Sequence, residues 1–287
     1  MNIIRKGQLN TCTIREKVIS DTSVTYITFD NLEQTGIIRQ GFSTRLGGVS
    51  EGEFASMNLS FSRNDDPQAV MENYRRFAAI MDCTPDDVVA SHQTHTTNVR
   101  RVSSADKGKG VTRKKDYSDI DGLITDESGV LLACFFADCV PLYFVDPVHH
   151  AIGLAHSGWR GTVGKIGKNT VQLMQENFGS KPEDLLAAVG PSVCMDCYEV
   201  SEDVAEAFAK EFPDNEKEIL KSKGSGKYLL DLWRANEIVF MEAGVPKEQI
   251  VTTNLCTCCN PKLLFSHRAS HGKRGNLGAF LMIKEQG

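Results

Sequence analysis

A cysteine and a histidine frame two apolar segments near the middle of the chain. In the stretch ADCVPLYFVDPVHHAIGLAHSGWRG, residues 137–161, Cys139 begins the first segment and His156 ends the second. Near-continuous apolar runs of this length are typical of buried strands. We therefore expect two neighbouring strands that bring a thiol and an imidazole to one end of a rigid sheet, where functional residues are commonly placed.

Spacing alone leaves three interpretations of this pair open. A histidine that holds a cysteine as a thiolate gives a nucleophile for acyl or amide chemistry. As metal ligands, Cys139 and His156 need a third protein ligand, because three ligands with an open fourth position define a catalytic zinc site. In the third interpretation, a buried cysteine and a capped histidine have no chemical role.

A helix is predicted directly behind His156. Its free first backbone N–H groups favour an anion at this place. Trp159 and Arg160 lie on its first turn, and an ordinary salt bridge is the alternative role for Arg160. Six residues form the apolar stripe of this helix, which Gly179 ends: Val163, Ile166, Thr170, Leu173, Met174 and Phe178.

A glycine-punctuated loop is a second candidate for ligand binding. Glycines let backbone amides approach a ligand closely, and an arginine offers a planar fork for phosphate. A surface turn followed by a strand is an equally good interpretation, because the segment fits neither a Walker nor a dinucleotide pattern. The loop lies in GFSTRLGGVSEGEFASMNLSF, residues 41–61, and carries Ser43, Arg45, Gly47, Gly48 and Asn58.

Two histidines interrupt a pair of predicted strands within residues 88–102. If the polar segment stays extended, His92 and His95 point to opposite faces, because an odd number of residues separates them. At most one of them then faces a common site.

Two Cys-x-x-Cys pairs form the strongest formal zinc signature of the chain: Cys194 with Cys197, and Cys256 with Cys259. Four thiolates suit a closed tetrahedral site. The gap between the pairs is far longer than in usual zinc ribbons, and Cys258 is surplus. We therefore prefer the interpretation that these are buried, reduced cysteines that pack as small apolar residues.

The composition excludes several classes of protein. With 41% hydrophobic and 24% charged residues, the chain of 287 residues can bury a sizeable core. The net charge of -5 and the absence of a long basic run argue against a nucleic-acid or membrane partner, although a local basic pocket for a small anion remains open. The first twenty residues lack the apolar core of a signal peptide, and the nine cysteines are an odd number in a large chain. We therefore expect a cytoplasmic protein with reduced thiols.

Strands and helices alternate along the chain, with antiparallel strands predicted over residues 10–42. Asp66 and Pro67 begin a packing helix that is predicted to reach Cys83, and helices are also expected over residues 201–212 and 231–243. Asp121 and Gly122 are predicted to form only a turn, and the basic cluster within residues 103–119 to lie on a solvated surface. Without a repeat or a linker, we predict a mixed α/β fold in a single domain over residues 1–287, in which residues 1–40 form N-terminal strands.

Several separated motifs occur in an order that resembles the laccase-domain purine nucleoside phosphorylase family, also labelled multicopper polyphenol oxidoreductase-like. They are FSTRLGGVSEGEFASMNL, SHQTH, DGLIT, ADCVP, AHSGWRGT, GPSVC..CYEV and NLCTCCN...LFSHR. The resemblance runs from about Gly41 to the C-terminus. It implies a layered sandwich of mixed β-sheets flanked by helices.

The resemblance also implies a zinc site with three protein ligands. Carried over position by position, these are His95, Cys139 and His156, with one zinc per chain. His92 falls outside the pattern, which agrees with the expectation that His92 and His95 point to opposite faces. The family is associated with phosphorolysis of adenosine, inosine, guanosine and 5'-methylthioadenosine, and with adenosine deamination. The implied partners are therefore purine nucleosides and phosphate, in a monomer or a small homo-oligomer.

The chain departs from the family's pattern near its C-terminus. It has Ser-His-Arg-Ala at residues 266–269 where the family often has Ser-x-Arg-Arg, and Lys273-Arg274 where Gly-Arg is frequent. We therefore restrict an anion-binding role in this region to Arg268. A four-copper centre is rejected, because the chain has seven histidines and no His-x-His pair. Copper remains a second metal for the three-ligand site.

These residues suggest two reactions. In phosphorolysis, phosphate is gathered by Arg45, the Gly47-Gly48 loop and the Trp159-Arg160 turn, with Ser43, Asn58 and Arg268 as further binding residues.

In deamination, Asp138 shuttles the proton, as a non-ligand acid does in other zinc deaminases. Arg45, Asp138 and Cys139 are thus the predicted catalytic residues. On a regular strand Asp138 faces away from Cys139, unless Pro141 forces a bulge.

Two rival classes make different predictions. A Cys-His amidohydrolase that uses Cys139 and His156 would be inactivated by iodoacetamide and would survive chelation. A non-enzymatic metal-binding protein would hold about one zinc per chain and turn over no nucleoside.

Overall fold

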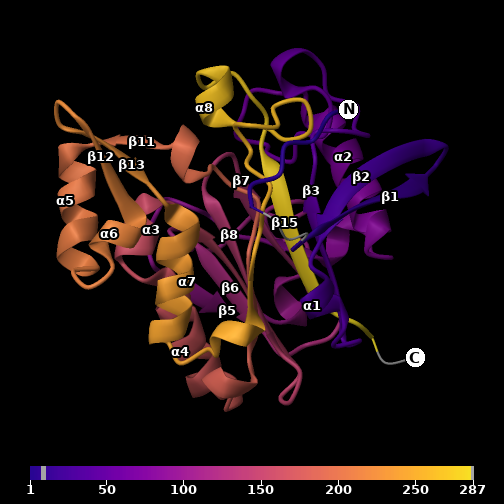
Figure 1. Cartoon of the computed structure of the whole chain (residues 1–287). Helices are drawn as coiled ribbons and strands as arrows, with labels where there is room; N and C mark the ends of the chain where they lie inside the picture. The colour runs from indigo at the N-terminus through magenta and orange to yellow at the C-terminus, as the bar shows by residue number, and fades with distance from the viewer. Residues whose placement is uncertain (8–10, 286–287) are drawn as a thin grey trace.

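The structure is a computed structural model that describes residues 1–7 and 11–285 (Figure 1). Asn10, the first residue of the predicted N-terminal strand segment, lies outside these residues. Two six-stranded sheets form the centre of the fold, and a small three-stranded sheet lies to one side.

The first sheet confirms the predicted N-terminal strands. Its neighbours are antiparallel except for the last two strands, which are parallel. The final strand of the chain pairs between the third and seventh strands, so residues near both ends of the sequence share one sheet. In spatial order the strands are β1 (Thr13–Ile19), β2 (Thr22–Thr28), β3 (Ile38–Ser43), β15 (Leu277–Ile283), β7 (Leu131–Phe136) and β4 (Val88–Ala90).

The second sheet contains the two apolar strands that Cys139 and His156 frame. β8 and β9 are antiparallel neighbours at its centre, and every residue in them is buried, as their continuous apolar runs predict. Parallel pairs close both edges. In spatial order the strands are β14 (Ile250–Thr252), β10 (Leu186–Val189), β8 (Val140–Asp146), β9 (Ala151–Ser157), β6 (Gly122–Thr125) and β5 (Val99–Arg101).

Three apolar layers hold the sheets and helices together. Between the two sheets, Leu132 and Leu281 of the first share one core cluster with Leu154 of the second. On the outer face of the first sheet, Phe77 of helix α2 (Pro67–Ile80) lies 4.6 Å from Phe280, measured between ring centroids. This arrangement confirms the predicted layered sandwich of mixed sheets flanked by helices.

The outer face of the second sheet carries the longer helices of the C-terminal half. Helices α4 (Ile166–Phe178) and α7 (Leu232–Glu242) bury their apolar stripes against it, and Phe240 packs edge-on to Phe144 at 5.1 Å. The other α-helices are α1 (Asp30–Glu33), α3 (Trp159–Val163), α5 (Glu202–Glu211), α6 (Glu216–Ile219) and α8 (His267–Ser270). The three-stranded sheet consists of β11 (Glu199–Ser201), β13 (Lys227–Leu230) and β12 (Leu220–Gly224).

Two predicted helix boundaries need correction. Helix α2 (Pro67–Ile80) begins at the Asp66 cap as expected, but it stops three residues before Cys83 because Asp82 is left-handed (φ 54°). The helix predicted behind His156 is two helices. Lys165 adopts a left-handed conformation (φ 55°) between α3 and α4, and its ammonium group is tied to Glu211 and Glu242.

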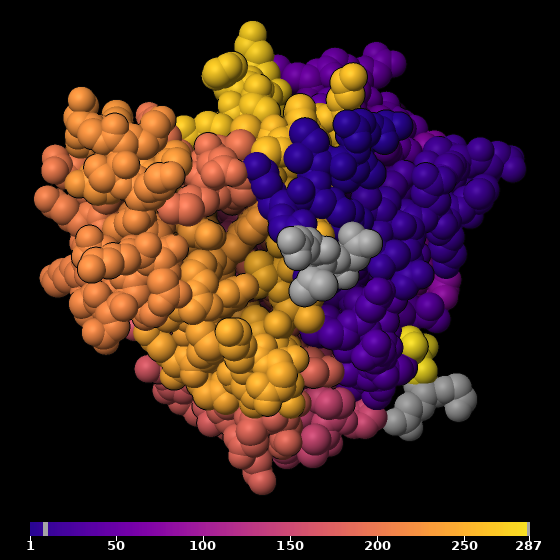
Figure 2. Space-filling model, in the orientation of Figure 1, coloured from indigo at the N-terminus to yellow at the C-terminus, as the bar shows by residue number. Residues whose placement is uncertain are grey.

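The N-terminal residues lie on the surface against the C-terminal part of the chain (Figure 2). Arg5 forms an isolated bridge with Leu255, and the amide of Ile4 donates to Asn260 Oδ1 at 2.8 Å. None of the helices in residues 1–7 and 11–285 combines the length and the apolar character needed to cross a membrane.

Candidate metal centre and its two cavities

His95, Cys139 and His156 converge from three separate elements. His95 lies in the loop between β4 and β5, Cys139 immediately precedes β8, and His156 is near the end of β9. Their donor atoms all lie within 4.8 Å of one another. Cys139 Sγ is 3.8 Å from His95 Nε2, and the two imidazole rings meet edge to face with centroids 4.9 Å apart. The structure thus brings together all three predicted ligands.

The register of β8 and β9 explains how two of the ligands meet. Pro141 pairs with His156, so Cys139 lies at the same end of the hairpin. Directly after β9, Gly158 leaves room for the cluster. A Cβ atom at this position would lie 2.8 Å from His95 Cδ2 and 3.3 Å from Cys139 Sγ, so a larger residue here would displace a ligand.

His95 reaches the cluster through backbone geometry that its sequence does not reveal. Its φ of 65° is left-handed, so the segment that holds both histidines is not extended as the opposite-face argument assumes. His92 nevertheless lies outside the group of three ligands, and its Nδ1 accepts a hydrogen bond from the amide of Asp119.

The buried carboxylate of Asp121 organises two of the three ligands. Its Oδ1 lies 2.8 Å from His156 Nδ1 and accepts from the His95 amide at 3.1 Å. Its Oδ2 accepts from the amides of Thr94 and Thr96 and from the Thr96 hydroxyl. Asp121 therefore leaves Nε2 of His156 free for a metal and fixes the loop that presents His95. The sequence predicts only a turn at this residue and misses this role.

The electrostatics of the cluster favour a bound cation. Burial raises the pKa of Cys139, but the two imidazoles outweigh this effect and lower the pKa to about 6. Burial lowers the pKa of His156, but Cys139 and Asp121 outweigh it and raise the pKa to about 9. Without a metal the pair is therefore a thiolate and an imidazolium at neutral pH, and the proton on His156 occupies the place of a metal.

The donor set fits zinc. Two imidazole nitrogens and one thiolate are three ligands with a fourth position open, which is the arrangement of catalytic zinc sites. Trigonal copper sites also use two histidines and a cysteine, usually with a methionine as a weak axial ligand. Among the described residues, no methionine lines the cavities next to this cluster.

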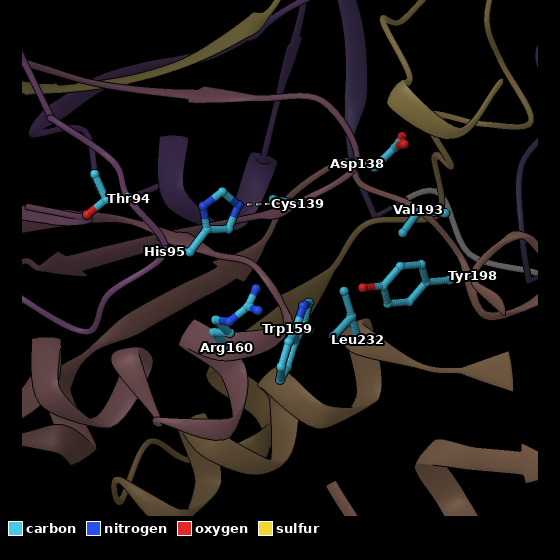
Figure 3. Close-up of a pocket in the computed structure, with 9 residues that line it drawn as sticks. All are labelled: Thr94, His95, Asp138, Cys139, Trp159, Arg160, Val193, Tyr198 and Leu232. Carbon is cyan, nitrogen blue, oxygen red and sulfur yellow. Dashed lines mark hydrogen bonds between the residues drawn. The ribbon is translucent and has the colours of Figure 1, made fainter. Parts of the chain in front are cut away.

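Two cavities open on the cluster and share Thr94, His95 and Cys139 in their walls. The smaller, which we call the small cavity, has a volume of about 240 Å³ (Figure 3). The ring faces of Trp159 and Tyr198 form part of its wall, and the Tyr198 hydroxyl points into it (Figure 3). Its lining is completed by Asp138, Arg160, Val193 and Leu232.

The second cavity, the large cavity, has a volume of about 620 Å³ and a basic lining. Arg63, Lys115 and Arg274 contribute to its wall, whereas none of the described residues that line it is a carboxylate. The Nε atom of Arg274 is buried without a hydrogen-bond partner among the described residues. Burial and the nearby Arg63 lower the pKa of Arg274 to about 10. This cavity is therefore suited to an anion.

The three cations of the large cavity are functional candidates that the sequence did not indicate. Lys115 belongs to the basic cluster assigned to a solvated surface, yet it is half-buried and donates to the Ser91 carbonyl at 2.9 Å. Arg274 lies in the region where an anion-binding role was restricted to Arg268. The spacing of these residues gives no motif, because the fold alone brings them together.

The glycine-punctuated loop does not reach the metal centre. Among the described residues, those that line the two cavities include none of its five candidates: Ser43, Arg45, Gly47, Gly48 and Asn58.

Arg45 is used within the protein. It donates to the carbonyls of Ala55 and Pro261 and lies over the Phe265 ring at 4.6 Å. Gly47 is left-handed (φ 88°), and a Cβ atom there would lie 2.6 Å from the Ser23 carbonyl oxygen.

Ser43 and Asn58 also bond to the protein itself. The Ser43 hydroxyl accepts from the Gly278 amide at 2.8 Å, and Asn58 Oδ1 accepts from the amides of Ser60 and Asn276. The structure therefore places these five residues outside the cavity walls, although Leu59, Ser60 and Phe61 at the end of the same segment line the large cavity.

The Asp138 carboxylate faces away from His95 (Figure 3), as expected, but strand alternation is not the reason. Because β8 begins only at Val140 and Asp138 is left-handed (φ 82°), strand alternation does not apply, and Asp138 and Cys139 line the same cavity. The pairing of β8 with β9 is continuous, so a bulge at Pro141 is not the reason. The carboxylate itself points away from His95 (Figure 3).

Hydrogen bonds hold that carboxylate at the rim of the small cavity. It accepts from the Thr257 hydroxyl and from the Arg268 amide, both at 2.6 Å. The Arg268 guanidinium lies over the Tyr198 ring at 5.5 Å and donates to the Glu199 carbonyl. Arg160, in turn, lies over the Trp159 ring at 4.2 Å. The structure thus brings Asp138, Trp159, Arg160 and Arg268 to one side of the metal centre.

Comparison with known proteins gives consistent matches over most of the chain. Residues 39–284 match the family described as multi-copper polyphenol oxidoreductase laccase. The purine nucleoside phosphorylase YlmD of Geobacillus stearothermophilus is 38% identical over 250 residues, which are 86% of this chain and 90% of that protein. The crystal structure of YlmD from the same species superposes with a TM-score of 0.85 at 35% identity, over 94% of this chain and 99% of that one. Adenosine deaminase RL5, from an unknown prokaryotic organism, is 32% identical over 231 residues, or 80% of this chain and 88% of that protein.

Replacing Asp121 with asparagine should weaken metal binding at this centre. The Asp121→Asn variant keeps the shape of the side chain but loses a charge and an acceptor, so His156 and the His95 loop are less firmly held. Loss of such a partner typically costs about 10- to 100-fold in metal affinity. Competition with a chromophoric chelator measures the change. The matched control is Asp119→Asn, which removes an exposed acceptor of the Thr94 hydroxyl. Equal affinities in both variants and the unmodified chain would contradict the role assigned to Asp121.

Metal affinity should also depend on pH in a defined way. Binding requires a Cys139 thiolate and a neutral His156. Between about pH 6 and about pH 9, Cys139 is a thiolate and His156 carries a proton that the metal must displace, so affinity should rise about tenfold per pH unit. Below about pH 6 the slope should steepen because Cys139 is also protonated, and above about pH 9 it should level off. A flat profile between pH 6 and pH 9, measured by competition, would contradict this assignment.

Proposed function

The chain belongs to the multi-copper polyphenol oxidoreductase laccase family, and we propose that it is a zinc-dependent purine nucleoside phosphorylase. The similarity to YlmD supports this activity. The observation that carries the proposal is the position of the His95, Cys139 and His156 cluster, which lies between a basic cavity and an aromatic one. We further propose a monomer or small homo-oligomer in the cytoplasm, where its nine free cysteines would stay reduced.

Phosphorolysis needs two binding sites on opposite sides of the ribose. Phosphate must approach the anomeric carbon from the side opposite to the departing purine. The large and small cavities meet at Thr94, His95 and Cys139, so a ribose at this shared wall would have one substrate on each side. Holding both reactants in this geometry removes most of the entropic cost of their encounter.

We assign phosphate to the large cavity. Arg63, Lys115 and Arg274 supply positive charge without a competing carboxylate in the described lining, and Arg274 Nε is a buried donor that a phosphate oxygen would satisfy. This assignment replaces Arg45 and the glycine loop, whose polar groups are bonded to the protein. That loop then supports Phe265 and the neighbouring segments.

We assign the purine to the small cavity. The ring of Trp159 offers a face for stacking, and Val193 and Leu232 add apolar surface. Burial raises the pKa of Tyr198 to about 12, so its hydroxyl keeps its proton at neutral pH. We infer that Tyr198 Oη donates to a ring nitrogen of the departing purine. The chemistry supplied by zinc, when it is bound, is polarisation of an oxygen atom at the open position.

Deamination of adenosine is a second candidate activity, which the similarity to adenosine deaminase RL5 favours. The purine cavity is the same, but the amino group would face the cluster and no phosphate is needed. Asp138 is the proposed proton carrier in this reaction. Its carboxylate would have to exchange the hydrogen bond from the Thr257 hydroxyl for one with the substrate.

An assay of four nucleosides with and without phosphate tests these proposals. We expect adenosine, inosine, guanosine and 5'-methylthioadenosine to give free base and a sugar 1-phosphate only when phosphate is present. Inosine formed from adenosine without phosphate would report deamination. Activity that survives chelation but is lost with iodoacetamide would instead indicate a Cys-His amidohydrolase. Bound zinc without turnover of any nucleoside would leave a metal-binding protein and overturn the proposal.

Substitution of Arg274 should separate the two reactions. Removing a hydrogen bond to a charged group costs about 1.5–3 kcal/mol, so Arg274→Gln should raise KM for phosphate by about 10- to 100-fold. Deamination, which uses no phosphate, should be unchanged. Arg75→Gln, on an exposed helix surface, is the matched control.

The Arg45→Ala variant tests whether the glycine loop, rather than the large cavity, binds phosphate. Because Arg45 bonds to Ala55 and Pro261, we expect this variant to lose thermal stability and to keep its KM for phosphate. A raised KM for phosphate in Arg45→Ala together with an unchanged KM in Arg274→Gln would instead indicate that phosphate binds at the glycine loop.

A further inference from the structure

The two Cys-x-x-Cys pairs meet at a second place in the fold. Sγ atoms of Cys194, Cys197, Cys256 and Cys259 all lie within 4.8 Å of one another. We propose that they form a second metal site, the four-cysteine site, which holds a structural zinc ion. The sequence favoured four cysteines that pack as buried apolar residues. Two observations favour a metal site instead: Cys197 and Cys259 are only partly buried, and the fold closes the long gap between the pairs.

The distances between the sulfur atoms match tetrahedral coordination. Four thiolates about 2.3 Å from a zinc ion lie about 3.8 Å from one another. Cys197 Sγ is 3.5 Å from Cys259 Sγ, and Cys194 Sγ is 4.0 Å from Cys259 Sγ. A disulfide would require about 2.0 Å, and all nine cysteines are free.

Each pair is folded into a turn that directs its two sulfurs to the same side. The Cys197 amide donates to the Cys194 carbonyl at 3.0 Å and closes a turn of 3-10 helix over Met195–Cys197. In the second pair, the Asn260 amide donates to the Cys256 carbonyl at 3.2 Å. Both turns are formed by the protein alone, so the ligands are oriented before a metal binds.

Backbone amides also stabilise sulfur as a thiolate in this cluster. Cys256 Sγ accepts from the amides of Cys194 and Cys259, at 3.2 and 3.4 Å. Donors aimed at a ligand sulfur are the partners that orient it and offset its charge in metal sites. Four thiolates this close together repel one another unless a cation lies between them. A soft, thiophilic cation is required, and closed four-cysteine sites are typical of structural zinc.

The four-cysteine site joins two loops that build the small cavity. Residues 190–198 follow β10 and contribute Val193 and Tyr198 to the cavity wall. Residues 253–260 follow β14, and there the Thr257 hydroxyl holds the Asp138 carboxylate. The loops also meet at a bridge in which the Thr257 amide donates to the Ser192 carbonyl at 3.1 Å. A metal at the four-cysteine site would hold the two loops together. The proposal of this site does not depend on the proposed phosphorylase activity.

Zinc content separates this site from the first one. The full chain, purified with zinc, should hold two zinc ions per chain. Cys139→Ser disables the first site and should leave one zinc. Adding Cys259→Ser should remove that ion as well and lower the melting temperature. Adding Cys258→Ser instead is the matched control, because Cys258 is the neighbouring cysteine outside the group of four, and this variant should keep one zinc.

Cobalt substitution keeps the test decisive if Cys259→Ser does not fold. In the Cys139→Ser protein, Co²⁺ should give the intense visible bands and the thiolate charge-transfer bands of tetrahedral thiolate coordination. The proposal would be overturned by a Cys139→Ser protein that holds no metal, or by equal zinc loss with Cys258→Ser and Cys259→Ser. A disulfide detected by mass, or stoichiometric iron in place of zinc, would also overturn it.

Discussion

The buried carboxylate of Asp121 is the interaction on which the candidate active site depends. It immediately precedes β6, and it is bonded both to His156, near the end of β9, and to the loop that carries His95. Five donors converge on its two oxygens. Burying a carboxylate with fewer hydrogen-bond donors around it would cost free energy of folding. The sheet therefore fixes Asp121, and Asp121 in turn fixes the ligands.

The surroundings of the metal centre divide into two chemically different halves. Arg63, Lys115 and Arg274 give the large cavity a positive lining, although the chain as a whole has a net charge of -5. The small cavity is aromatic and apolar, and its walls are loops that follow β10 and β14. If both proposed sites hold zinc, one metal would support these loops and the other would lie at the reacting atoms. The two metal sites would then have separate tasks, one structural and one catalytic.

Much of the fold could be predicted from local pattern, whereas the site required tertiary information. The apolar runs of β8 and β9 placed Cys139 and His156 at one end of a hairpin, and the Asp66 cap located α2. His95 was identified as a ligand through the family resemblance, because its left-handed backbone cannot be read from spacing. Asp121, Arg63 and Arg274 were missed because their partners are remote in sequence. The two cysteine pairs were recognised as a formal zinc signature, but their meeting in space could not be predicted, since three α-helices lie between them in sequence.

The decisive measurement is a crystal structure recorded at the zinc absorption edge, with phosphate and a non-cleavable C-nucleoside analogue of inosine bound. It would show whether zinc lies at the His95, Cys139 and His156 cluster between the two substrates. We predict an anomalous peak about 2.3 Å from Cys139 Sγ and in contact with His95 and His156. Phosphate should lie against Arg274, and the purine should stack on Trp159 with a ring nitrogen next to Tyr198 Oη. Absence of metal at this cluster, or both ligands in one cavity, would contradict the account.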